Sequence, residues 1–146
     1  MINEILNEEI KKAQMHMRFA DSLINKTKKS ELKWRVLIES VLNNLPNNLI
    51  ENEFFKISYD KSYYTKTQQG TIYLIYEWFE SGRDGIVSEG FGLYVQYLSE
   101  NRVYKIDCSE SILYRLRNLI EYAEFPNEQQ IENSKIQKFI EDFLSN

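Results

Sequence analysis

Apolar residues recur at helical spacing along the first part of the chain. They follow one another at intervals of three and four, so they share one stripe of a helix: Ile2, Leu6, Ile10, Ala13, Met17, Ala20 and Ile24. A stripe of this kind is normally buried against the rest of a protein. The pattern therefore predicts a long amphipathic helix over about residues 3–25, packed on the core by this stripe.

A second helical pattern follows a short polar break at residues 26–29. Its apolar positions are Trp34, Leu37, Val41 and Leu45, with Ile38 and Leu42 beside them. Ser30 is a suitable N-cap, and Pro46 ends the pattern because proline has no backbone N–H for a helix interior. We expect a second helix from Ser30 to Leu45 that forms a helical hairpin with the first.

From about residue 54 the apolar period changes to two, which is the period of a β-strand. Residues 54–59 predict a short strand, and residues 71–79 predict a stronger one that is apolar on both faces. Residues 91–97 repeat the alternation. Residues 102–107 supply a fourth strand after a very short connection, which predicts an antiparallel hairpin.

Two more helical patterns close the chain. Ser109 or Ser111 can cap the first, which Pro126 ends, and Asn127 with Gln130 has the spacing of a capping box for the second. The order is α-α-β-β-β-β-α-α. It predicts a single α+β domain over residues 1–146, in which an antiparallel sheet of about four strands is flanked by two N-terminal and two C-terminal helices.

Composition and charge place the chain among ordinary globular proteins. It has 146 residues, of which 42% are hydrophobic and 27% charged, and 18 basic against 22 acidic side chains give a net charge of -4. No apolar run approaches the roughly 20 residues that a membrane-spanning helix needs. The first ten residues carry three glutamates, unlike a signal peptide. We therefore expect a cytoplasmic protein that does not contact membranes.

The inventory of reactive side chains is small. The chain has one histidine, His16, and one cysteine, Cys108, so a zinc site is not expected, and the glycine-rich loops that bind nucleotide phosphates are missing. We predict no metal and no cofactor. Cys108 precedes a predicted helix and is the best candidate nucleophile, with His16 as a conceivable base. A packed, unreactive cysteine is the competing interpretation, and we expect no enzyme.

Nucleic acid is not an expected partner. Phosphate neutralisation supplies most of the affinity of nucleic-acid-binding proteins and requires a strongly basic face. The only dense basic cluster lies at residues 26–35, next to a predicted helix junction, and the rest of the chain is acidic. A solvated helix end accounts for that cluster.

The segment between the second and third predicted strands is the strongest candidate for recognition. Residues 80–90 form a long connection with three glycines, and residues 77–89 carry four acids, Glu77, Glu80, Asp84 and Glu89, against Arg83 alone. Loops mounted on a rigid sheet often carry binding function. A solvated hairpin tip is the alternative interpretation.

Aromatic residues concentrate in the same part of the chain. Thirteen of the twenty lie between Phe54 and Tyr104. Six are tyrosines that the predicted strands bring near the acidic loop: Tyr63, Tyr64, Tyr73, Tyr76, Tyr94 and Tyr97. Tyrosine is enriched at protein interfaces, although we expect about half of these to be core. The predicted partner-binding surface consists of Glu77, Glu80, Arg83, Asp84, Glu89 and Tyr94.

These observations favour a protein that binds another protein stoichiometrically. We expect an inhibitor or immunity-type protein that neutralises a basic partner, such as a nuclease toxin or a defence effector, because an acidic loop would steer encounter with a basic cleft. The alternative is a small-ligand or peptide-binding module, such as a chaperone-like homodimer, that uses an apolar sheet face. An enzyme that uses Cys108 or clustered carboxylates ranks last.

Overall fold

The computed structural model describes residues 2–37, 45–52, 54–81, 83, 85–124 and 128–145. Three helices lie in these segments: α1 (Ile2–Lys28), α2 (Glu110–Glu124) and α3 (Glu128–Ser145). A single turn of 3₁₀ helix, η3 (Asn47–Leu49), precedes the main strands. None of the described helices combines the length and the apolar content needed to cross a membrane.

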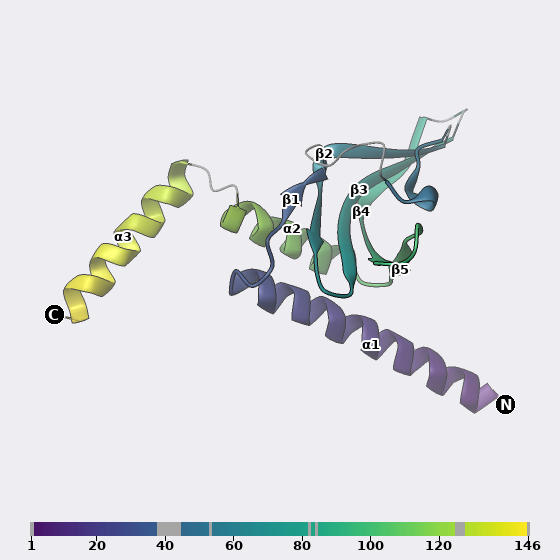
Figure 1. Ribbon diagram of the computed structural model, residues 1–146, viewed down its shortest axis with the longest axis horizontal. Helices are drawn as coiled ribbons and strands as arrows, with labels where there is room; N and C mark the ends of the chain where they lie inside the picture. The colour runs from purple at the N-terminus through teal and green to yellow at the C-terminus, as the bar shows by residue number, and fades with distance from the viewer. Residues whose placement is uncertain are drawn as a thin grey trace.

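Five strands of the described chain form one antiparallel sheet in sequence order. They are β1 (Arg35–Val36), β2 (Phe55–Lys66), β3 (Gly70–Ser81), β4 (Gly85–Tyr97) and β5 (Tyr104–Ile106). Strands β2, β3 and β4 are long, while β1 and β5 are short edge strands (Figure 1). The fold class is α+β with an antiparallel sheet, as the sequence predicts.

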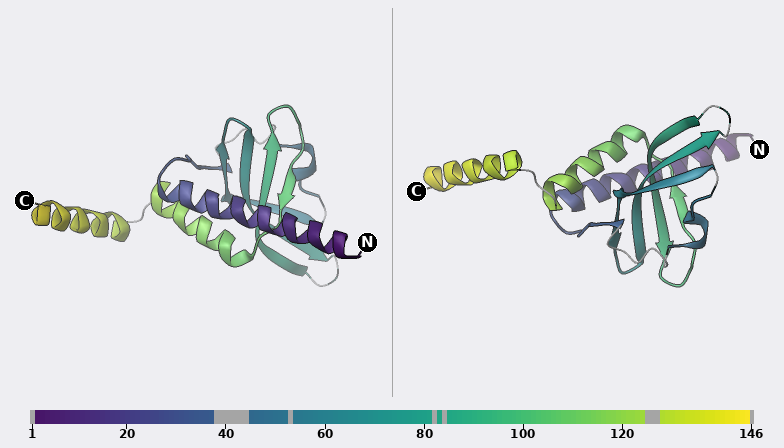
Figure 2. Two further views of the ribbon diagram at one scale, coloured as in Figure 1. Left: turned by 90° about the horizontal axis from the view of Figure 1, so that it is seen from below. Right: turned by 90° about the horizontal axis from the view of Figure 1, so that it is seen from above.

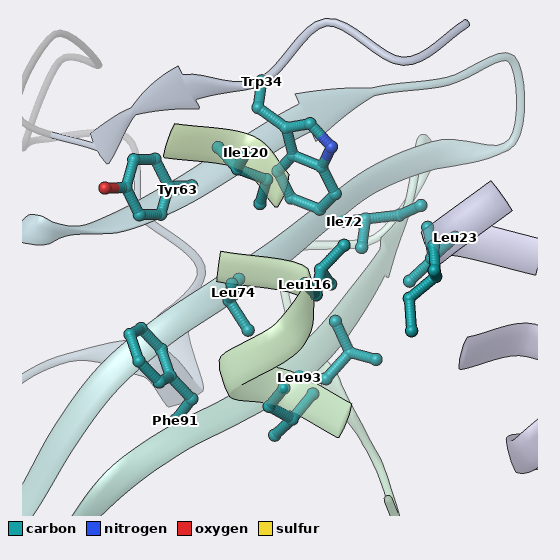
Figure 3. Packing of buried hydrophobic residues seen from close by; sticks show 11 residues of the cluster. Leu23, Trp34, Tyr63, Ile72, Leu74, Phe91, Leu93, Leu116 and Ile120 are labelled. Atoms are coloured by element: carbon teal, nitrogen blue, oxygen red, sulfur yellow. The ribbon is translucent and has the colours of Figure 1, made fainter. Parts of the chain in front are cut away.

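One face of the sheet is covered by α1 and α2, which lie side by side (Figure 2). Leu74 of β3 pairs with Leu93 of β4, and both side chains point toward the helices. Leu116 and Ile120 of α2 and Leu23 of α1 complete this core (Figure 3). The hydrophobic effect, on the order of 25 cal/mol per Å² of apolar surface removed from water, holds the helices on this face.

The opposite face carries a second buried cluster. Tyr73 and Ile75 of β3 point to this side, where Ile57 of β2 and Leu49 of η3 cover them. The prediction that residues 71–79 are apolar on both faces is confirmed, because successive strand residues alternate between the two clusters.

The predicted helix over residues 30–45 is wrong where the structure describes it; residues 38–44 lie outside the described residues. Ser30, the expected N-cap, instead ends α1 with φ 58°. The N–H of Glu31 donates to the Lys26 carbonyl at 2.9 Å, as in a Schellman motif. The chain then pairs with β2 as β1, so that Trp34 enters one core and Leu37 the other.

Two strands are longer than the sequence predicts. β2 continues beyond residue 59 to Lys66 across an irregularity between Ser58 and Tyr63, where the Ser62 hydroxyl donates to the Ser58 carbonyl at 2.6 Å. β4 begins at Gly85, inside the predicted loop. A bulge interrupts the alternation of apolar and polar residues that marks a strand. The sequence pattern therefore predicts that β2 ends earlier than it does.

The N-terminal half of α1 and the whole of α3 extend away from the sheet (Figures 1 and 2). Ala20 and Ile24 are buried, but Leu6, Ile10 and Met17 on the same stripe are exposed. The expected burial of the complete stripe is therefore wrong for this half of the helix. The apolar residues of α3 are likewise exposed in the described structure.

Substitution at the centre of the sheet tests this account of the core. Leu74 is 0% exposed, and Leu74→Ala should lower the free energy of unfolding by about 2–5 kcal/mol, because a cavity remains between sheet and helices. Leu98, which is 75% exposed, is the matched control. Leu98→Ala should change the free energy of unfolding by less than about 0.5 kcal/mol. Urea denaturation measures both; equal losses would contradict the assignment.

Candidate functional site

The candidate site lies on the hairpin formed by β3 and β4. Ser81 pairs with Gly85, so only residues 82–84 connect the two strands, and most of the predicted loop over residues 80–90 is strand. Arg83 is exposed at the turn. Asp84 lies outside the described residues.

Two of the predicted residues, Glu77 and Tyr94, form an inward-facing pair. Glu77 is only 6% exposed, and the Tyr94 hydroxyl donates a hydrogen bond of 2.6 Å to its Oε2. Lys105 Nζ lies 3.9 Å from the other carboxylate oxygen. The carboxylate has room because residue 92 is glycine, where a Cβ atom would lie 2.6 Å from Glu77 Oε1.

Burial controls the protonation of this pair. It raises the pKa of Glu77 above the ordinary value of 4.5, and the Tyr94 hydrogen bond and Lys105 oppose the rise. Burial also raises the pKa of Tyr94, with the Glu77 carboxylate adding to the effect. Tyr94 therefore remains a hydroxyl donor at neutral pH, and contacts within the sheet hold the pair in place.

Glu80 and Glu89 occupy the outer part of the hairpin. Glu80 is half-buried, and its Oε1 accepts a hydrogen bond of 3.0 Å from the indole N–H of Trp78. Glu89 is exposed and pairs with Trp78 across the sheet. The structure thus separates the predicted acids into an inward residue, Glu77, and outward or partly outward residues near the hairpin end.

Most of the tyrosines predicted to lie near the loop face the interior. Tyr63 and Tyr73 are buried, Tyr64, Tyr76 and Tyr94 are half-buried, and Tyr97 is exposed. The Tyr73 hydroxyl donates to Gln96 Oε1 at 2.7 Å. Two of the six are therefore buried core residues, fewer than the expected half, and three more are partly buried.

Strand β4 has an open outer edge beside the hairpin. β5 pairs with Leu93, Tyr94 and Val95 only, so within the described chain residues 85–92 have no strand on that side. Within this segment Gly90, Phe91 and Gly92 are buried, so an added strand would reach backbone N–H and C=O groups only at residues 85–89. This edge is the part of the sheet best suited to capture an extended segment of another chain.

A cleft of about 300 Å³ adjoins the open edge. Four carboxylates line it, Glu77, Glu89, Asp107 and Glu110, against the single ammonium of Lys105, which is four negative charges and one positive, or -3. Gly90 lets the Glu110 side chain approach the edge, because a Cβ atom there would overlap its carboxylate. We call this cleft, with the open edge of residues 85–92, the acidic edge.

Sequence reasoning missed Asp107 and Glu110, which reach the acidic edge from the connection between β5 and α2. Glu110 stands in the first turn of α2, where an acid favours the helix dipole, and this position is the one available signal. Two residues of α1 contact Asp107. Lys12 Nζ lies 3.7 Å from the Asp107 carboxylate, and the Asp107 backbone N–H donates to His16 Nδ1 at 2.8 Å.

His16 and Cys108 thus come to neighbouring positions, although nothing in the sequence joins them. Within the described contacts His16 is bonded to the backbone of residue 107 and not to the thiol. Burial raises the pKa of the Cys108 thiol, and Asp107 raises it further. The thiol is therefore protonated at neutral pH and lacks the activation that nucleophilic catalysis requires.

The acids of the cleft do not converge on one point. Among the residues that the structure describes, no three His, Cys, Asp or Glu side chains are close enough together to hold a metal ion. The arrangement is suited to long-range attraction of positive charge and to hydrogen bonding along a strand edge.

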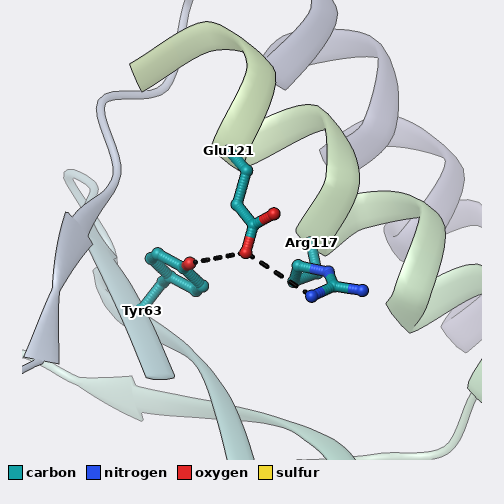
Figure 4. Close-up of polar contacts among 3 residues, drawn as sticks. All are labelled: Tyr63, Arg117 and Glu121. Carbon is teal, nitrogen blue, oxygen red and sulfur yellow. Dashed lines mark hydrogen bonds and ion pairs between the residues drawn. The ribbon is translucent and has the colours of Figure 1, made fainter. Parts of the chain in front are cut away.

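A second polar cluster joins α2 to β2 (Figure 4). The Tyr63 hydroxyl donates to Glu121 Oε1 at 3.1 Å, and Arg117 Nη1 lies 3.5 Å from the same oxygen. Burial raises the pKa of Tyr63 to about 12, with Glu121 adding to the rise. The Arg117 guanidinium also lies over the rings of Phe91 and Tyr114. These contacts anchor α2 on the sheet.

A larger groove of about 890 Å³ lies between α1 and the turn joining β2 to β3. Its apolar lining comes from both layers, namely Phe19, Leu23, Leu32, Ile72 and Val95. Lys26 and Lys66 stand beside Glu31 among its polar residues. It differs from the acidic edge in both charge and apolar content.

The buried Glu77 carboxylate predicts a specific pH dependence. Its folded-state pKa is raised, so its stabilising contribution is complete below the unfolded-state pKa and is lost as pH rises through the folded-state value. Glu77→Gln removes this titration. The stability of the wild type relative to Glu77→Gln should therefore decline as pH rises above the ordinary glutamate pKa of 4.5.

Urea denaturation at several pH values measures the difference in unfolding free energy between the wild type and Glu77→Gln. Glu31→Gln is the control because Glu31 is exposed. A Glu77→Gln difference that follows the same pH profile as this control, or that rises with pH, would refute the assigned cause.

No family model, curated protein or solved structure matches this chain. Inference about its function therefore rests on the acidic edge and on the groove of about 890 Å³.

Proposed function

We propose that this chain is a stoichiometric protein-binding protein, an inhibitor or immunity-type protein that neutralises a basic partner such as a nuclease toxin or a defence effector. It captures the partner along the acidic edge. The observation that carries the proposal is that residues 85–92 have no strand on their outer side within the described chain and border a cleft lined by four carboxylates and one ammonium.

The open edge supplies the contacts of such a complex. An extended segment that adds to a sheet edge gains main-chain hydrogen bonds, and its alternate side chains enter neighbouring pockets. Beside residues 85–92 those side chains meet Glu89, Asp107 and Glu110, all exposed. Lysine or arginine at alternate positions of the added segment satisfies these acids.

The charge of the acidic edge affects which partner binds, and how fast, more than it affects the affinity of the complex. Exposed carboxylates attract a basic surface over about a Debye length, roughly 8–10 Å at physiological salt, and accelerate encounter. They also repel acidic chains, which gives selectivity. Affinity then depends on the strand pairing and on apolar contacts with residues such as Phe79 and Ile106 in the cleft.

A small-ligand or peptide-binding module is the second candidate, and the groove of about 890 Å³ favours it. Ile72 and Val95 bring part of an apolar sheet face to that groove, where Leu32 and Phe19 complete an apolar wall. Binding there would depend on these apolar residues and would be insensitive to charge at the acidic edge.

Charge reversal at the acidic edge tests the proposal. Glu89→Lys with Glu110→Lys should weaken capture of a basic protein from the source cells by about tenfold or more, because attraction becomes repulsion. The immobilised chain is exposed to lysate at low and at moderate salt, and retained proteins are identified by mass spectrometry. Titration of the retained protein's activity should end at one chain per molecule if the chain inhibits it.

Glu8→Lys with Glu31→Lys is the matched control, since it changes the net charge equally at two exposed residues outside the cleft. The control should retain the same protein as the wild type, and circular dichroism should show that both variants are folded. Retention of no basic protein, or equal retention by the edge variant, would overturn the proposal.

A further inference from the structure

Helix α3 presents an apolar surface that no described part of the chain covers. All its described side chains, at residues 131–145, are exposed, and both Phe139 and Phe143 are 72% exposed. An isolated helix of 18 residues is marginal in water, and most helices in proteins are stabilised by packing. The helix therefore requires a surface against which to pack.

The exposed residues form one stripe. Ile136, Phe139, Ile140 and Phe143 are spaced by three and four, with Leu144 beside them. The contact that ties α3 to its own chain lies on the other side, where the hydroxyls of Tyr122 and Ser134 are 3.0 Å apart. Ser134 precedes Phe143 by nine residues, which is half a turn away around a helix. The stripe consequently lies on the side of α3 opposite this contact.

We propose that α3 pairs with α3 of a second copy in an antiparallel, two-fold arrangement, so that the chain is a homodimer. Such an interface uses the same patch on both copies and is self-complementary. Ile136 of one copy fits between Phe139 and Phe143 of the other, and the two-fold axis repeats the contact. The inference is independent of the partner-binding function proposed above.

Charge complementarity selects the antiparallel direction. Lys135 and Asp142 are seven residues apart and flank the stripe on one side. When Ile136 sits between Phe139 and Phe143 of the second copy, Lys135 comes beside Asp142 of that copy, and symmetry provides two such ion pairs. In a parallel pair identical residues lie level, and these ion pairs are lost.

The exposed stripe of α1 is a competing surface for α3. An antiparallel pairing that brings both stripes together would set Ile136 beside Ala13 and Phe143 beside Leu6. Asp142 of α3 would then lie close to Glu9 of α1, and like charges would meet. Pairing of α3 with itself avoids this repulsion, and we therefore assign the second copy's α3 as the occupant.

Dimer dissociation is the first measurement. Two short stripes bury an area at the low end of specific interfaces, so sedimentation velocity of the full chain should show a reversible dimer with a dissociation constant on the order of 1–100 μM. Phe139→Asp with Phe143→Asp should raise that constant by about tenfold or more. A chain that stays monomeric to about 500 μM overturns the proposal.

Leu6→Asp with Ile10→Asp is the matched control, because it places the same charges on the exposed stripe of α1. It should leave dimerisation unchanged, and circular dichroism should show that both double variants keep their helices. Loss of the dimer in the control overturns the pairing of α3 with itself, whether or not the α3 variant also dissociates.

A charge exchange tests the direction of pairing. Lys135→Glu alone should weaken the dimer, because two carboxylates would then face each other at each of the two ion-pair positions. Lys135→Glu combined with Asp142→Lys should restore the wild-type dissociation constant, since the opposite charges are only exchanged. A helix that associates only through nonspecific apolar contacts would not show this recovery. Failure of the combined variant to recover overturns the antiparallel arrangement.

Discussion

Burial of β3 on both faces is the constraint on which the rest of this structure depends. Leu74 lies beneath α1 and α2, while Ile75, the next residue, lies beneath η3, and both are 0% exposed. A strand that alternates between two apolar clusters must be central and must be covered twice. The helices α1 and α2 supply one cover, and Leu37, Leu49 and Val103 pack on the other side.

The same burial explains where the protein can act. Glu77 lies on the strand that is covered twice, and its carboxylate is compensated by the Tyr94 hydroxyl and by Lys105, with Gly92 leaving space for it. A buried charge without such partners would be costly. Residues 85–92, at the margin of the sheet beyond the end of β5, have no strand on their outer side within the part of the chain that the structure describes. The acidic edge proposed for recognition and the α3 surface proposed for self-association are separate.

Two segments show how tertiary contacts override local pattern. The spacing of three between apolar residues predicts a helix over residues 30–37. In the structure, the Trp34 indole N–H donates to the buried Thr27 hydroxyl at 3.1 Å, and β1 pairs with Tyr63 and Tyr64. Residues 80–90 read as a loop because of their glycines and acids. Pairing with β3 turns most of them into strand, since a long neighbouring strand offers hydrogen bonds to almost any sequence beside it.

By itself the sequence determined the α+β class, the antiparallel order of the main strands, the long first helix and the apolar character of both faces of β3, because these follow from the period of apolar residues. It also placed Glu89 and Arg83 outside the core. Only the tertiary structure decided that Glu77 and Tyr94 turn inward and that Asp107 and Glu110 join Glu89 at one cleft. Periodicity gives the face on which a residue lies within its own element, whereas contacts between distant elements depend on how those elements pack.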